Sequence, residues 1–200
     1  MRALIAIFAA AAAACVAAPA SLEAQDVSAA QEDKRLIPAG HGTLKQDEFT
    51  VQLRSGPLLI KVTPLSEVVI RTAAPDTYER LHALAESRRK DAESRSGTMD
   101  PQLFLVSFFS YQADVSFQPE DLQLIHHGRP MRAAILPITP GWGTQQLKQQ
   151  DLQSAIYAFS EPIDYDRPLV VQYGTTQSGA WDQIISRLQT ERNKILSRAQ

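Results

Sequence analysis

Apolar and polar residues alternate with a period of two over much of the chain between Phe49 and Tyr173, and this pattern constrains the fold most strongly. In residues 49–54 every second side chain is apolar, and the same holds for residues 58–63. The turn-forming sequence Ser55-Gly56-Pro57 separates these two segments. We therefore predict an antiparallel hairpin, the simplest unit of a β-sheet protein.

Strand patterns continue along the chain. They cover residues 67–72, 103–109, 115–117, 122–125, 133–138, 155–159 and 169–173. The segment 103–109 is apolar on both of its faces, which is typical of a central strand covered on both sides. His127-Gly128-Arg129 has the composition of a tight turn. About eight short strands with regular turns predict an antiparallel sandwich.

Two segments have the helical period instead. Asp76-Thr77-Tyr78-Glu79 has the form of a capping box, which predicts an inserted helix over residues 76–94 with Asp76 as its N-cap. A second helix is predicted over residues 180–198, with Ser178 able to cap it. Its apolar stripe is formed by Trp181, Ile184, Ile185 and Leu188, and is interrupted at Glu191 and Arg192.

One part of the pattern also resembles a known type of domain. The segments that carry it are Phe104–Phe109, Phe117–Leu124, Ile156–Phe159 and Leu169–Tyr173. They resemble immunoglobulin-like β-sandwich domains of uncharacterised bacterial secreted proteins and lipoproteins. The resemblance covers residues 103–174 and implies an immunoglobulin-like sandwich outside the cytoplasm, with no particular activity. The two helices and the missing Cys–Trp–Cys core depart from the antibody type.

The N-terminus has the layout of a secretory signal peptide. Met1-Arg2 precedes an apolar run over residues 3–14, and small residues follow as far as Ala20. The run is shorter than the ~20 apolar residues that span a bilayer, and Pro19 interrupts it. We therefore expect residues 1–20 to be removed, with cleavage after Ala24 as a second choice.

Cys15, the single cysteine of the chain, allows a different outcome. Ala12-Ala13-Ala14-Cys15 loosely resembles a bacterial lipobox, in which the cysteine becomes the lipidated N-terminus. The departures are Ala12, where leucine is usual, and Val16, where a small residue is usual. If cleavage occurs after Ala20 instead, the mature chain has no cysteine, which excludes disulfides, thiolate chemistry and cysteine-ligated metal.

The rest of the chain is expected to form one domain. Residues 21–40 have few large apolar side chains, so we expect a flexible tether before a single β-sandwich domain with accessory helices over residues 41–200. Loss of Arg2 with the leader changes the net charge from −2 to −3. This balance gives no general attraction for nucleic acid. No second apolar stretch is long enough to span a membrane.

The sequence carries no recognisable catalytic constellation, metal site or cofactor motif. No histidine or cysteine lies four residues from His82, and His126 and His127 are expected on opposite faces of a strand. No Gly-x-Ser-x-Gly elbow occurs, and the carboxylate pairs Glu120-Asp121 and Asp164/Asp166 lie among turn residues. We therefore expect no metal, no cofactor and no catalytic role for these residues.

Trp142 is the candidate binding residue. Gly141-Trp142-Gly143 places a large aromatic side chain in a loop bounded by prolines. An exposed indole there could anchor a partner. The alternative is that Trp142 folds inward and closes one end of the sandwich.

The expected function is that of a non-catalytic binding or structural module of the cell envelope, periplasmic or secreted, whose partner is another envelope protein or polymer. One alternative is a secreted hydrolase with an unrecognised carboxylate–histidine site. Another is self-assembly through the C-terminal helix.

Overall fold

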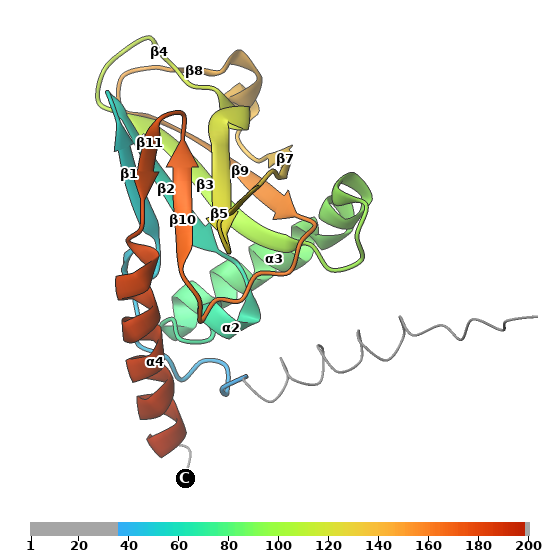
Figure 1. Ribbon diagram of the computed structural model, residues 1–200, viewed down its shortest axis with the longest axis vertical. Coiled ribbons are helices and arrows are strands. Elements are labelled where there is room, and N and C mark those ends of the chain that lie inside the picture. The colour runs from blue at the N-terminus through green and yellow to red at the C-terminus, as the bar shows by residue number, and fades with distance from the viewer. Residues whose placement is uncertain (1–35, 199–200) are drawn as a thin grey trace, which may run out of the picture. The chain divides into compact units, whose positions relative to one another are not determined.

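The computed structural model describes residues 36–198, and Figure 1 shows their arrangement. The predicted signal peptide, Cys15 and most of the predicted tether lie outside the described residues. Within them, Ile37 is buried, so the folded unit includes the end of the segment predicted as tether.

Five antiparallel strands form the larger sheet. Its order is β1 (Val51–Ser55), β2 (Leu58–Pro64), β3 (Gln102–Ser110), β9 (Asp151–Phe159) and β7 (Ala134–Pro137). The predicted hairpin is confirmed, because Val51 faces Val62 and Ser55 faces Leu58. The central position predicted for residues 103–109 is also confirmed, since β3 lies between β2 and β9.

A four-stranded antiparallel sheet has the order β11 (Thr176–Ser178), β10 (Leu169–Tyr173), β5 (Leu122–His126) and β6 (Arg129–Met131). A small third sheet pairs β4 (Val115–Ser116) with β8 (Gln146–Leu147). Short 3-10 turns occupy Gln46–Glu48, Pro119–Asp121 and Pro140–Thr144. The outer strands β6 and β7 each contain a proline, Pro130 and Pro137.

The two larger sheets share one hydrophobic core. The Phe108 ring on β3 lies 5.7 Å from the Tyr173 ring on β10 and 4.7 Å from the Phe117 ring. One continuous cluster of buried side chains includes residues of both sheets. The fold is therefore mainly β and antiparallel, with an inserted helix and a C-terminal helix, as predicted.

The strand predicted over residues 67–72 is wrong, because Glu67–Ile70 form a short helix, α2. The Ser66 carbonyl accepts hydrogen bonds from the amides of Val69 and Ile70. Both of those side chains are fully buried. Neighbouring residues of a strand point to opposite faces, whereas one helical turn lets both enter the same core.

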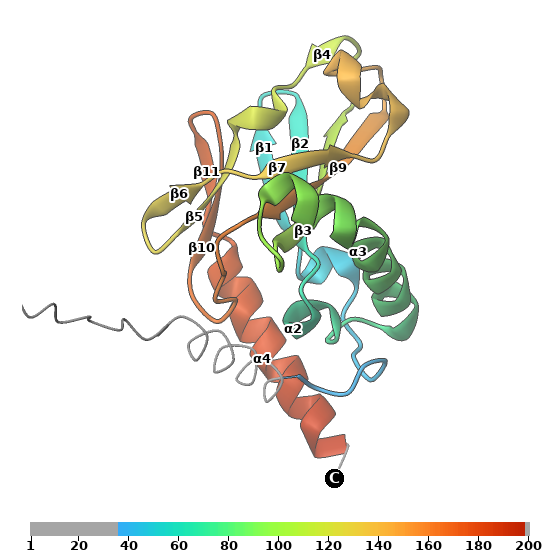
Figure 2. The same ribbon diagram turned by 90° about the vertical axis from the view of Figure 1, so that its right-hand side faces the viewer.

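The inserted helix, α3 (Pro75–Ser96), confirms the prediction to within two residues, but the predicted Asp76 cap is wrong. The N-cap is Ala74, which makes no side-chain cap bond, and Pro75 occupies the first turn. A proline there needs no N–H partner and already has a helical φ. Gly97 ends the helix at φ 73°, a left-handed conformation that glycine adopts without strain. Figure 2 shows α3 beside the larger sheet, where it contacts β9 and β7.

The C-terminal helix, α4 (Trp181–Arg198), also agrees with the prediction. Trp181, Ile184 and Leu188 are buried, and the Ala180 amide donates to the Ser178 hydroxyl at 3.4 Å. The predicted interruption of the stripe is wrong at Glu191, because this side chain is only 1% exposed. Its Oε1 accepts hydrogen bonds from the Thr43 amide at 3.1 Å and from the Thr43 hydroxyl at 2.7 Å.

Candidate functional site

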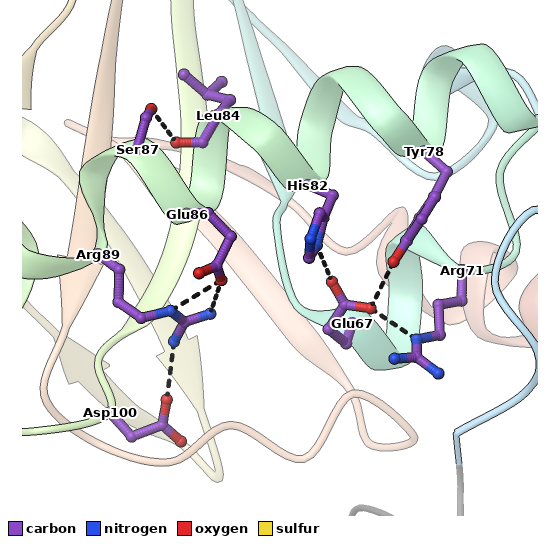
Figure 3. Close-up of polar contacts among 9 residues, drawn as sticks. All are labelled: Glu67, Arg71, Tyr78, His82, Leu84, Glu86, Ser87, Arg89 and Asp100. Carbon is purple, nitrogen blue, oxygen red and sulfur yellow. Dashed lines mark hydrogen bonds and ion pairs between the residues drawn. The ribbon is translucent and has the colours of Figure 1, made fainter.

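A constellation of polar side chains surrounds Glu67 on α2 (Figure 3). Glu67 Oε1 lies 2.7 Å from Nδ1 of His82 on α3. Glu67 Oε2 accepts hydrogen bonds from Arg71 Nε at 2.6 Å and from the Tyr78 hydroxyl at 3.3 Å. We call Glu67, Arg71, Tyr78 and His82 the Glu67 cluster.

The electrostatics of the cluster favour an ionised carboxylate. Burial by itself would raise the pKa of Glu67, but hydrogen bonds and positive charge from Arg71 and His82 outweigh it. The net result is a Glu67 pKa below its ordinary value. Burial and the neighbouring Glu67 charge raise the pKa of the Tyr78 hydroxyl. At neutral pH the cluster therefore contains a carboxylate beside a guanidinium and a protonated phenol.

The Glu67–His82 pair has the geometry that orients a general base. A carboxylate on Nδ1 fixes the imidazole and leaves Nε2 able to accept a proton. Within residues 36–198, however, no hydroxyl or thiol group is hydrogen-bonded to His82. Arg71 also donates to the Ile37 carbonyl at 3.1 Å, so the cluster connects residue 37, α2 and α3. Its demonstrable role is to join these segments.

Figure 3 also shows a second polar group farther along α3. Arg89 lies 3.0 Å from the Glu86 carboxylate and 3.5 Å from the Asp100 carboxylate. Arg88 faces Asp91 at 4.0 Å. The basic residues of this helix are thus interspersed with carboxylates, as on an ordinary solvated helix face.

His126 and His127 do not point to opposite faces, which corrects the prediction. Their ring centroids lie 4.0 Å apart. His127 has φ 50° and Gly128 has φ 74°, so β5 ends at His126 and a two-residue turn leads to Arg129. The alternation of a strand therefore does not extend to His127.

Both carboxylate pairs noted in the sequence lie in turns, Glu120 and Asp121 in the 3-10 turn Pro119–Asp121, and Asp164 and Asp166 in the segment before β10. The Asp166 amide donates to Asp164 Oδ1 at 3.0 Å, which is the local turn bonding expected for aspartate. The Asp166 carboxylate pairs with Arg192 of α4 at 2.7 Å. Among residues 36–198, no group of three or more histidine, cysteine, aspartate or glutamate side chains is placed to hold a metal ion.

Trp142 is buried, with 6% of its surface exposed. Its ring packs against Phe117 at 5.2 Å, Phe108 at 5.8 Å and Tyr157 at 6.5 Å. The exposed-anchor hypothesis is therefore wrong for this residue, because the indole has no free face. The alternative in which Trp142 folds inward agrees with the structure.

The sequence analysis missed an apolar surface on the outer face of the larger sheet. Leu59 of β2, Phe109 of β3 and Leu152 of β9 are direct cross-strand neighbours. We call these three residues the outer row. Leu152 is 48% exposed, and Tyr111, whose ring lies 4.7 Å from that of Phe109, is 64% exposed. The prediction that β3 is covered on both faces thus fails at Phe109, which is only half-buried.

The signals for both missed features were present but incomplete. The spacing of four between Glu67 and Arg71, and between Tyr78 and His82, would place each pair on one face of a helix. The strand prediction for residues 67–72 concealed the first of these pairs. The outer row needs the strand register, which the sequence does not provide.

Within residues 36–198, no helix combines the length and the apolar character needed to cross a membrane. In comparisons with known proteins, no family model, no curated protein and no solved structure matches the chain.

Proposed function

We propose that the protein is a non-catalytic binding or structural module of the cell envelope, located outside the cytoplasm, that contacts a partner through the outer row and Tyr111. The single observation that supports this role is the partly exposed apolar row, Leu59–Phe109–Leu152, on a sheet whose opposite face forms the core. The predicted signal peptide supports the location. The immunoglobulin-like resemblance is consistent with such a module and remains a prediction.

The outer row is a candidate contact surface because its apolar side chains are adjacent. Isolated exposed apolar residues are ordinary, whereas adjacent ones form a patch that water solvates poorly. Strand register brings Leu59, Phe109 and Leu152 side by side, and Tyr111 adds a second aromatic ring. The Phe109 and Tyr111 rings meet edge to face, at 88°, so together they form a corner and no flat platform. Such a corner suits the apolar side chains of a protein partner better than the flat face of a sugar.

The test is capture of a partner from envelope extract by the mature protein. We expect Phe109→Ser together with Leu152→Ser to abolish capture of any partner that the wild type retains. The matched control is Met99→Ser, because Met99 is an exposed apolar residue outside the row. Equal capture by all three proteins, or no specific partner at all, would contradict the proposal.

A secreted hydrolase is the second candidate, and the 2.7 Å Glu67–His82 contact favours it. In that role His82 would be the general base and Glu67 would orient it. A screen against ester, amide and glycoside substrates should then reveal an activity that His82→Ala removes. Activity that survives His82→Ala would eliminate this site.

Self-assembly through α4 is the remaining candidate, since Leu196 near its end is 48% exposed. Leu196→Ser should then lower the oligomeric mass in solution. Deletion from Leu188 onward is a poor test, because Leu188 is buried and its removal would disturb the fold.

A further inference from the structure

The imidazole of His126 connects two segments that are distant in sequence. It lies at the end of β5 and is 6% exposed. Its Nε2 accepts a hydrogen bond from the Asp164 amide at 3.3 Å, and its Nδ1 lies 3.4 Å from the Pro168 carbonyl oxygen. The amide can only donate and the carbonyl can only accept, so both bonds require a neutral ring with its proton on Nδ1.

The segment that His126 holds is the connection between β9 and β10, residues 160–168. Its other side is attached to α4. Trp181 Nε1 donates to the Tyr165 carbonyl at 3.2 Å, and Arg192 Nη1 donates to Asp166 at 2.7 Å. The connection therefore lies between the β5–β6 hairpin and the C-terminal helix, and His126 supplies its attachment to the hairpin.

We propose that His126 is an acid-sensitive attachment point whose protonation breaks the hydrogen bond that holds the Asp164 amide of the 160–168 connection to the end of β5. A proton on Nε2 occupies the lone pair that accepts the Asp164 N–H, so two donors then face each other. The hydrogen bond between the Asp164 amide and Nε2 is then lost, and the connection moves away from the ring at this point. This inference is independent of the binding role proposed for the outer row.

The groups that face His126 favour a response in mildly acidic conditions. Burial and the adjacent His127 lower the pKa of His126 below its ordinary value, 6.5, against opposing effects of the Pro168 carbonyl and Asp164. Arg129, its cross-strand neighbour, adds a further positive charge on the hairpin. On the connection, Asp164 itself lies 3.8 Å from Arg167. Since the folded state prefers the neutral ring, the attachment is complete above about pH 6.5 and is lost as the pH falls through the lowered value.

The experiment follows the Asp164 amide and the His126 ring by NMR while the pH of the intact protein falls from about 7.5 to about 5. We expect the exchange protection of the Asp164 amide to fall by about tenfold or more, as one lost hydrogen bond gives. This loss should have the same midpoint as the His126 titration, below 6.5. In a Trp142→Phe background, Trp181 fluorescence should change at that midpoint.

Three substitutions give the test its controls. His126→Gln places a neutral amide oxygen near the position of Nε2, so the transition should disappear. His127→Gln removes the adjacent positive charge and should move the midpoint to higher pH. His41→Gln, at an exposed histidine, should leave it unchanged.

The proposal is wrong if the Asp164 amide keeps its protection while His126 titrates, or if His126→Gln retains the transition. Should His126→Gln fail to fold, the wild-type titration and the His127→Gln shift still decide the question. Capture of a partner through the outer row plays no part in these measurements.

Discussion

The two long helices are attached to the body by different means. On α4, large side chains are buried, including Trp181, Ile184 and Leu188. On α3, one leucine and two alanines are buried, Leu81, Ala85 and Ala92. Large apolar side chains remove much surface from water, whereas alanines contribute little area and mainly allow close approach. The attachment of α3 therefore depends more on the polar Glu67 cluster.

The polar contacts of the helices differ as well. Glu191 of α4 is fully buried and accepts two hydrogen bonds from Thr43, whereas Glu67 is half-buried and shares its charge with Arg71 and His82. A buried carboxylate is costly unless its partners are complete. We therefore expect α4 to be sensitive to the loss of its buried contacts, and the attachment of α3 to depend on pH.

The largest effect is expected for Trp181→Ala, which should lower the free energy of unfolding by about 3–5 kcal/mol, the usual cost of truncating a buried aromatic residue. Urea unfolding followed by circular dichroism measures it. Ala85→Gly on α3 removes one methyl group and should lower the free energy of unfolding by only about 1 kcal/mol. An equal loss for the two variants would contradict the difference between the helices.

Removal of the buried carboxylate should have the next largest effect. Glu191→Ala leaves the Thr43 amide and hydroxyl without their acceptor, at a cost of about 1–3 kcal/mol. The matched control is Glu79→Ala on the exposed side of α3, which should change stability by no more than about 0.5 kcal/mol. Similar unfolding midpoints for the two variants would mean that the Glu191–Thr43 hydrogen bonds do not stabilise the fold.

The contribution of Glu67 should appear in the pH dependence of stability. Its pKa is lowered in the folded state, so its stabilisation is present above the ordinary value, 4.5, and is lost as the pH falls through the folded value. Glu67→Gln should therefore show a shallower decline in unfolding free energy below pH 4.5. Because the group is half-exposed, the difference should be about 1 kcal/mol or less. Parallel curves for the two proteins would show that the cluster does not stabilise α3.

The smallest effect is expected for Asp76→Ala. The capping box predicted there is absent, and Asp76 contributes only a negative charge in the first turn of α3. Thermal unfolding should therefore shift by an amount equivalent to about 0.5 kcal/mol or less. A loss above 1 kcal/mol would mean that Asp76 caps the helix in solution.

The sequence predicted correctly those elements in which buried apolar residues recur at a regular spacing. The hairpin of β1 and β2, the central β3 and both long helices repeat their apolar residues at the spacing of their own backbone. The error at residues 67–72 arose because Val68, Val69 and Ile70 are β-branched, a strand preference that packing against the core overrode.

The candidate sites were harder to predict, because they depend on contacts between distant residues. Glu67 and His82 are 15 residues apart, and their contact exists only after α2 folds against α3. The local sequence around Trp142 is compatible with both exposure and burial, and only the surrounding Phe108, Phe117 and Tyr157 rings decide between them.

The prolines on the outer strands limit how this protein can join others. Pro130 in β6 and Pro137 in β7 have no N–H, so a strand arriving from another molecule would lack a donor at each of these edges. The remaining edges of the two larger sheets, β1 and β11, contact each other. Growth of fibrils by continuous addition of strands is therefore disfavoured, which protects a chain rich in sheet from one of its main routes to aggregation.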